Sequence, residues 1–164
     1  MESFVDRKEL LSRLDFEYRR FRSNIAHLTP EQLQRPGAVG SWSIRDLIAH
    51  FIAHEQFALR ELQHALRGER YQPDENETDV INARAVTERQ GQPPDKVLRA
   101  WDESYRQIVA AVEALPDEAF DPSGSVVQLL EDTIDGALGN NTYQHYAEHL
   151  PSVMAWIQHQ PKVI

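Results

Sequence analysis

Proline and glycine divide this chain into long uninterrupted segments, and this division constrains the fold more than any other feature. Neither residue occurs in five segments: 1–29, 41–67, 74–90, 95–115 and 140–150. Strands in globular proteins usually have about 3–10 residues, whereas helices are commonly longer. The segments therefore favour helices, and the proline- and glycine-rich stretches between them favour turns and loops.

Apolar residues in two of these segments recur at helical spacing. When residues are placed about 100° apart around a helix axis, the apolar residues of each segment fall on one narrow face. In residues 1–29 this face contains Leu10, Leu14, Tyr18, Phe21, Ile25 and Leu28. In residues 95–115 it contains Val97, Trp101, Tyr105, Ile108, Val112 and Leu115. Both segments are thus predicted to be amphipathic helices.

Residues 41–67 begin with a signal for a helix start. The Ser43 hydroxyl can accept a hydrogen bond from a free backbone N–H, and Asp46 lies in the first turn near the positive end of the helix dipole. Gly68 marks the end. The apolar face of this helix is formed by Ile44, Leu47, Ile48, Phe51, Leu59 and Leu62.

The remaining segments complete an all-α prediction. Residues 74–90 are expected to form a shorter polar helix in a crossover connection, and 125–135 another short helix. The last long helix starts after Gly139 and runs towards Gln158, with a kink at Pro151, since proline cannot donate a backbone hydrogen bond. Four long helices predict a four-helix bundle with long connections after the second and third helices. The 164 residues suit one domain, 1–164.

Charge and composition exclude several functions. The chain has 17 Lys and Arg against 26 Asp and Glu, a formal net charge of −9, which argues against nucleic acid and anionic membranes as partners. No apolar run approaches the roughly 18–20 residues of a membrane span. The first ten residues lack the apolar region of a secretory signal, so a cytoplasmic protein is expected. Without cysteine, the chemistry must rest on acids and the seven histidines.

Four histidines form two pairs, each with members one helical turn apart. His149 falls within the apolar stripe of the last helix and His145 at its edge. His50 and His54 lie at the flank of the second helix, and by helical angle His54 is the better placed of the two. Two histidines from one helix and one from another would suit zinc or a related ion, with a fourth position left open. Alternatively, the imidazoles are buried and bonded to backbone carbonyls.

The sequence also offers acids that could support metal ligands, and a second metal-binding pattern. Such an ion would act as a Lewis acid, and each ligand would need a carboxylate or carbonyl on its second nitrogen. Nearby acids are Glu55, Glu61 and Glu148. Residues 145–149 also match the H-x-x-E-H pattern of inverted zincin peptidases, but no usual third ligand and no substrate-aligning strand accompany it. The surface is expected to hold the remaining histidines, His27, His64 and His159.

Three stretches of the chain together resemble a known family. Residues 40–55 contain the pattern W-S-x-x-D-L-x-x-H, residues 79–82 read D-V-I-N, and residues 141–149 end in H-x-x-x-H. In this order they resemble the DinB-like superfamily, and within it the branch of ClbS/DfsB-type proteins and maleylpyruvate isomerase N-terminal-like domains. The resemblance extends over nearly the whole chain.

The resemblance implies a bundle with long crossovers, often a homodimer, that holds a divalent metal such as zinc, nickel or iron. By position the ligands would be His50, His145 and His149, so the family pattern favours His50 over His54. Side chains expected to line the pocket are His54, Glu55, Asn82 and Tyr146.

The resemblance also implies an activity. The expected protein is an enzyme that directs water, or a low-molecular-weight thiol from solution, against a small electrophilic substrate. A metal-free hydrolase of the ClbS type is one alternative. The other is a dimeric stress or binding protein with a vestigial site.

Overall fold

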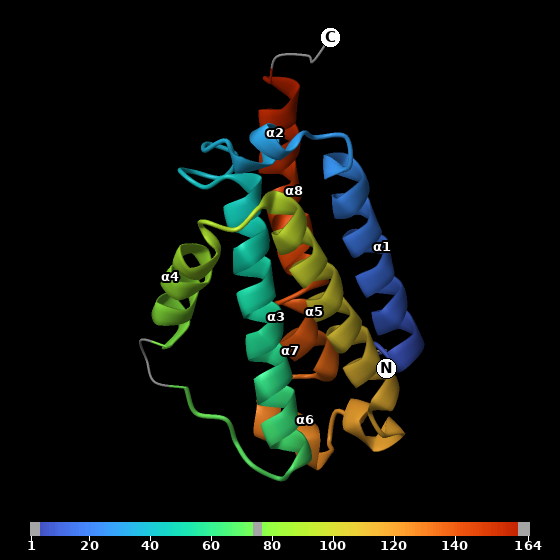
Figure 1. The fold of residues 1–164 in the computed structure, drawn as a ribbon. Helices are drawn as coiled ribbons and strands as arrows, with labels where there is room; N and C mark the ends of the chain where they lie inside the picture. Colours follow the sequence, from blue (N-terminus) through green and yellow to red (C-terminus); the bar gives the residue numbers. More distant parts are fainter. Residues whose placement is uncertain (1–3, 74–76, 161–164) are drawn as a thin grey trace.

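The computed structural model describes residues 4–73 and 77–160, which form helices joined by loops (Figure 1). In chain order the elements are α1 (Arg7–Ile25), α2 (Pro30–Gln34), α3 (Ile44–Leu66), α4 (Glu77–Arg89), α5 (Pro94–Ala114), the 3₁₀ helix η1 (Asp117–Phe120), α6 (Ser125–Leu130), α7 (Ile134–Gly139) and α8 (Tyr143–Gln158). Among the described residues the only β-type pairing is an isolated bridge between Val39 and Trp42. The all-α prediction is confirmed.

The four long helices α1, α3, α5 and α8 form the bundle. In Figure 1, α1 and α8 run in one direction and α3 and α5 in the other. Helix α1 packs against α8 and α5, and α3 packs against α5 and α8. Because α3 and α5 are parallel, the chain must return along the bundle between them. Helix α4 lies in this crossover and packs along α3, as expected for a long second connection.

Side-chain caps fix where two of the long helices, α1 and α3, begin. The Asp6 carboxylate accepts a hydrogen bond from the Glu9 backbone N–H at 2.9 Å, so α1 begins at Arg7. At α3, the Asp46 N–H donates to the Ser43 hydroxyl at 3.1 Å, and the Ser43 N–H donates to the Asp46 carboxylate at 3.1 Å. This reciprocal capping box confirms the predicted start of α3.

Two local features differ from the sequence prediction. Helix α2 occupies a stretch expected to be a turn, and its start carries a capping box between Thr29 and Gln32. The single helix expected at 125–135 is divided into α6 and α7, because Glu131 adopts a left-handed backbone conformation (φ 58°) and Thr133 caps a new helix. Helix α8 continues through Pro151 as one helix, and the kink expected there stays a prediction.

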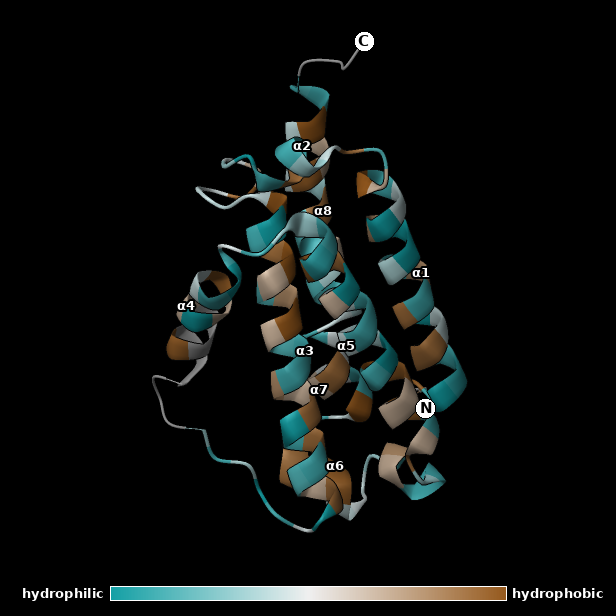
Figure 2. Cartoon of the chain, viewed as in Figure 1, coloured by the Kyte–Doolittle hydropathy of each residue, from teal (hydrophilic) through white to brown (hydrophobic). Residues whose placement is uncertain are grey.

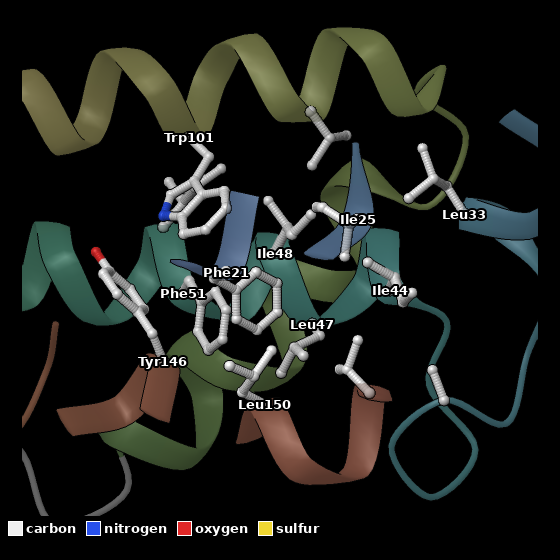
Figure 3. Close-up of a cluster of buried hydrophobic side chains, with 14 residues drawn as sticks. Phe21, Ile25, Leu33, Ile44, Leu47, Ile48, Phe51, Trp101, Tyr146 and Leu150 are labelled. Carbon is white, nitrogen blue, oxygen red and sulfur yellow. The ribbon is translucent and has the colours of Figure 1, made fainter. Parts of the chain in front are cut away.

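The predicted apolar stripes form the interior. Figure 2 shows the outward faces of α1 and α5 as mostly hydrophilic. Inside, Phe21, Phe51 and Trp101 from three helices pack edge to face or tilted, with ring centroids 5.2–5.5 Å apart, and Tyr146 of α8 joins them (Figure 3). Within residues 4–73 and 77–160, no helix has the length and hydropathy needed to cross a bilayer.

Candidate metal centre

Helices α3 and α8 bring two pairs of histidines face to face. The pairs are His50 and His54 on α3, and His145 and His149 on α8, each with a spacing of four residues that places both rings on one side of the helix. His50 Nε2 lies 3.0 Å from His145 Nε2. With His149 they form a trio in which each ring offers one nitrogen and all three nitrogens lie within 4.8 Å of one another.

Burial within the trio differs from the helical-angle prediction. His50 is 8% exposed and His145 7%, whereas His149, placed deepest by its angle, is only half-buried. The physical reason is the neighbouring helix. The rings of His50 and His54 cover His145, with centroids at 4.7 and 4.6 Å, and Phe51 packs on it at 5.0 Å. His145, which its helical angle places at the edge of the apolar stripe of α8, is therefore enclosed by α3.

The surroundings of His145 and His149 disfavour protonation of their rings. Burial, reinforced by the neighbouring His54, His50 and His149, lowers the pKa of His145 from 6.5 to about 2. Burial also lowers the pKa of His149, although Glu148 opposes this effect. A neutral imidazole keeps a lone pair on one ring nitrogen, which is the form that binds a metal ion.

The trio fits a divalent ion in donor type and spacing. Zinc binds imidazole nitrogens at about 2.0–2.1 Å, which places two ligands of a tetrahedral site about 3.3 Å apart. The His50–His145 separation of 3.0 Å is close to this value, and His149 offers a nitrogen within 4.8 Å of both. His145 Nδ1 is buried without a hydrogen-bond partner among the described residues. The acids expected to orient the rings do not do so for His145.

His54 lies beside the trio but outside it. Its ring centroid is 4.4 Å from that of His50 and 4.6 Å from that of His145, and its Nδ1 is 3.0 Å from Asn141 Oδ1. Helical angle favoured His54 over His50, whereas the structure brings His50 into the trio. The helical angle gives the direction of a side chain relative to the apolar stripe of its own helix. It does not say which other helix packs against that side.

Glu55 and Tyr146, both expected to line the pocket, instead bond to each other in the core. Glu55 is completely buried, and its Oε2 accepts hydrogen bonds from Trp101 Nε1–H at 2.8 Å and from the Tyr146 hydroxyl. In Figure 3 the Trp101 nitrogen and the Tyr146 oxygen lie on the same side of the cluster. Burial raises the pKa of Glu55 from 4.5 to about 7, against the opposing effect of hydrogen bonds from Tyr146, Ser104 and Trp101.

The remaining sequence candidates are Asn82, His27, His64 and His159. The Asn82 side chain is not among the described residues. His27 and His159 are exposed, as expected. His64 was also expected at the surface but is half-buried, with its Nδ1 2.8 Å from the Arg60 carbonyl oxygen.

Two further residues contact the histidine pairs and were missed as site residues. The Trp42 ring lies 5.0 Å from that of His50. It belongs to the W-S-x-x-D-L-x-x-H pattern, so a signal was available. Asn141 contacts His54, and no pattern in the sequence pointed to that contact.

Comparison with protein families identifies a family to which the chain belongs. The model described as the mycothiol maleylpyruvate isomerase N-terminal domain matches residues 14–137. This range includes His50 and ends before α8. Among proteins of curated function, none matches this sequence.

Several solved structures share the fold. The sibling lethal factor precursor protein DfsB superposes with a TM-score of 0.83 at 12% identity, covering 98% of this chain and 100% of its own. A protein from Streptococcus pneumoniae gives 0.80 at 9% identity, covering 96% and 93%. The colibactin self-resistance protein ClbS, in complex with a dsDNA, gives 0.78 at 13% identity, covering 95% and 98%. At these identities the likeness is one of fold.

Proposed function

Because this chain belongs to the family of the mycothiol maleylpyruvate isomerase N-terminal domain, within the DinB-like superfamily, we propose that it is a divalent-metal-dependent enzyme. Its ligands are His50, His145 and His149, and its substrate is a small electrophile. The reaction is a hydrolysis or the transfer of a low-molecular-weight thiol. As the chain contains no cysteine, the thiol comes from solution.

One observation carries the proposal: three imidazole nitrogens from two helices lie within 4.8 Å of one another. Zinc, nickel and iron all accept imidazole ligands, and three ligands leave a coordination position open. When bound there, such an ion supplies the Lewis acidity that activates water or a thiol at neutral pH.

The residues around the trio have their own tasks. Burial keeps His145 neutral, so a metal does not compete with a proton for its lone pair. Phe51 packs on His145 at 5.0 Å and on His149 at 6.0 Å, which restricts both rings. The bond from the Tyr146 hydroxyl to Glu55 ties α8 to α3 next to His145. These contacts hold the ligands in place before a metal arrives.

Metal content and titration calorimetry test the proposal. The purified protein is expected to bind one equivalent of zinc, nickel or iron, and His149→Ala to weaken that binding by on the order of 100-fold or more. His159→Ala is the matched control, because His159 is an exposed histidine at the end of the same helix. Absence of a bound ion in the wild-type protein, or equal affinity in the two variants, contradicts the proposal.

A metal-free hydrolase is the second candidate, and one contact favours it. At 3.0 Å, His50 Nε2 and His145 Nε2 satisfy each other without an ion, and the same contact suits a binding protein with a vestigial site. Turnover of an electrophilic substrate after dialysis against a chelator separates these candidates. A metal-dependent enzyme loses activity and regains it with added ion, a metal-free hydrolase keeps its activity, and a binding protein shows none in either state.

Location, assembly and partners complete the proposal. We propose one domain over residues 1–164, a cytoplasmic location, a homodimer and a small-molecule substrate, without nucleic acid. The net charge of −9 supports the last point, because DNA binding depends on clustered cations. The ClbS structure contains DNA, so the point needs a test. Anisotropy of a labelled DNA duplex at low salt is expected to stay unchanged, and sedimentation is expected to give twice the chain mass.

A further inference from the structure

The pair formed by His54 and Asn141 has a defined hydrogen-bond direction. Asn141 Nδ2 donates to the Ala137 carbonyl oxygen at 3.0 Å, so the amide nitrogen is committed to α7. The amide oxygen therefore faces His54 Nδ1, at 3.0 Å. An amide oxygen can only accept, which requires that His54 Nδ1 carries the hydrogen.

This arrangement determines the state of the other ring nitrogen. A neutral imidazole with hydrogen on Nδ1 has its lone pair on Nε2. His54 Nε2 is buried and has no hydrogen-bond partner among the described residues. Buried polar atoms in native proteins are nearly always paired, so an unpaired acceptor indicates a missing partner.

The place of the ring indicates where that partner would sit. His54 packs against His50 at 4.4 Å and against His145 at 4.6 Å, the two buried members of the trio. Its nitrogens nevertheless lie outside the group that can share one ion. His54 is therefore next to the candidate centre without belonging to the ligand set.

We infer that His54, oriented by Asn141, is a ligand-binding residue of this site whose Nε2 accepts a hydrogen bond from an O–H or N–H group of a molecule held at the trio. The inference rests on the proposed function for the trio. It adds a recognition element with a stated polarity: the site favours ligands that present a hydrogen-bond donor over ligands that present only lone pairs.

The tautomer is tested in the metal-free protein. Long-range ¹H–¹⁵N NMR of ¹⁵N-labelled histidines distinguishes hydrogen on Nδ1 from hydrogen on Nε2. We expect the Nδ1–H form of His54 in the wild-type protein and in Asn141→Asp, which retains an acceptor, and loss of this preference in Asn141→Leu. Hydrogen on Nε2 in the wild-type protein overturns the inference, whether or not metal binds.

Ligand polarity is tested in the zinc-loaded protein with two probes. Methanesulfonamide binds zinc as an anion that keeps one N–H, whereas thiocyanate has no hydrogen. His54→Phe is expected to weaken methanesulfonamide binding about 10-fold, the effect of one hydrogen bond. The same variant should change the affinity for thiocyanate by no more than about 2-fold, which is less than the change expected when one hydrogen bond is lost. His54→Gln supplies an amide oxygen and is expected to restore most of the sulfonamide affinity.

The outcomes separate this inference from the proposed function. Equal effects on both probes, or none, overturn the role of His54 while the metal site stands. A loss of zinc affinity in His54→Phe as large as that in His149→Ala makes His54 a metal ligand and also overturns the inference. If the wild-type protein binds none of zinc, nickel and iron, the proposed function fails and the ligand role fails with it.

Discussion

Replacing Glu55 by glutamine isolates the electrostatics of the core beside the candidate centre. Glu55 is completely buried, and its Oε2 accepts hydrogen bonds from Trp101 and Tyr146. Burial raises its pKa from 4.5 to about 7. Glutamine resembles the protonated acid, keeps an oxygen that accepts both bonds, and cannot ionise. The Glu55→Gln variant should therefore behave as a protein whose residue 55 is always neutral.

The sign and size of the effect follow from the two pKa values. Because the pKa of Glu55 is higher in the folded chain than in the unfolded chain, the folded state binds more protons between them, and stability falls as pH rises. The loss begins near pH 4.5 and ends above about pH 7. A shift of this size corresponds to about 3 kcal/mol in the free energy of unfolding between pH 4 and pH 8.

His145 changes stability in the opposite direction. Its pKa is lower in the folded chain, so the stability it contributes is present above pH 6.5 and is lost as pH falls. The wild-type profile combines both effects. The difference between wild type and Glu55→Gln removes the His145 contribution, because that residue is present in both proteins.

Urea unfolding followed by circular dichroism from pH 4 to pH 8 measures this difference. The stability of Glu55→Gln relative to wild type should rise by about 3 kcal/mol across the range. Glu113→Gln is the matched control, since it makes the same substitution at an exposed glutamate of α5. A flat difference for Glu55→Gln would refute the assignment of a raised pKa to this carboxyl.

Three further outcomes are expected from the same interior. Tyr146→Phe removes a hydrogen bond to the Glu55 carboxylate, so it should cost about 1–3 kcal/mol and raise the pKa of Glu55 further, as seen in the same urea and pH series. Phe51→Ala removes a completely buried ring and should lower the urea unfolding free energy by about 3–5 kcal/mol. Zinc at 100 times its dissociation constant should raise the unfolding free energy by about 2.7 kcal/mol in wild type and much less in His149→Ala, as measured by thermal unfolding at fixed zinc.

The helices were predictable because their signals are local. The stripe of α5 buries Val97, Trp101, Ile108 and Val112, and a period of about 3.6 residues is enough to predict it. The start of α3 follows from Ser43 and Asp46, three residues apart. Thr29 and Gln32 carry the same kind of signal for α2, so that short helix could also have been predicted from local sequence.

The site was less predictable because its environment comes from distant parts of the chain. Whether His145 or His149 is more buried depends on the path of α3, whose His50 lies 95 residues before His145, and no spacing within α8 records it. Glu55 is an acid on a helix whose donors, Trp101 and Tyr146, lie 46 and 91 residues away in sequence. The break at Glu131 depends on a left-handed backbone conformation at a residue type that seldom adopts it.

The core and the candidate centre share one axial register between α3 and α8. On α3, the residue after His50 is Phe51, about 100° further around the helix, and the residue after His54 is Glu55. On α8, His145 is likewise followed by Tyr146. The His54–His145 ring contact and the Glu55–Tyr146 hydrogen bond are therefore made by adjacent residues on both helices. A slip of one turn, about 5.4 Å, would break both contacts together. The hydrogen bond between the buried carboxyl and the tyrosine thus helps to fix the height at which the imidazoles of the two helices meet.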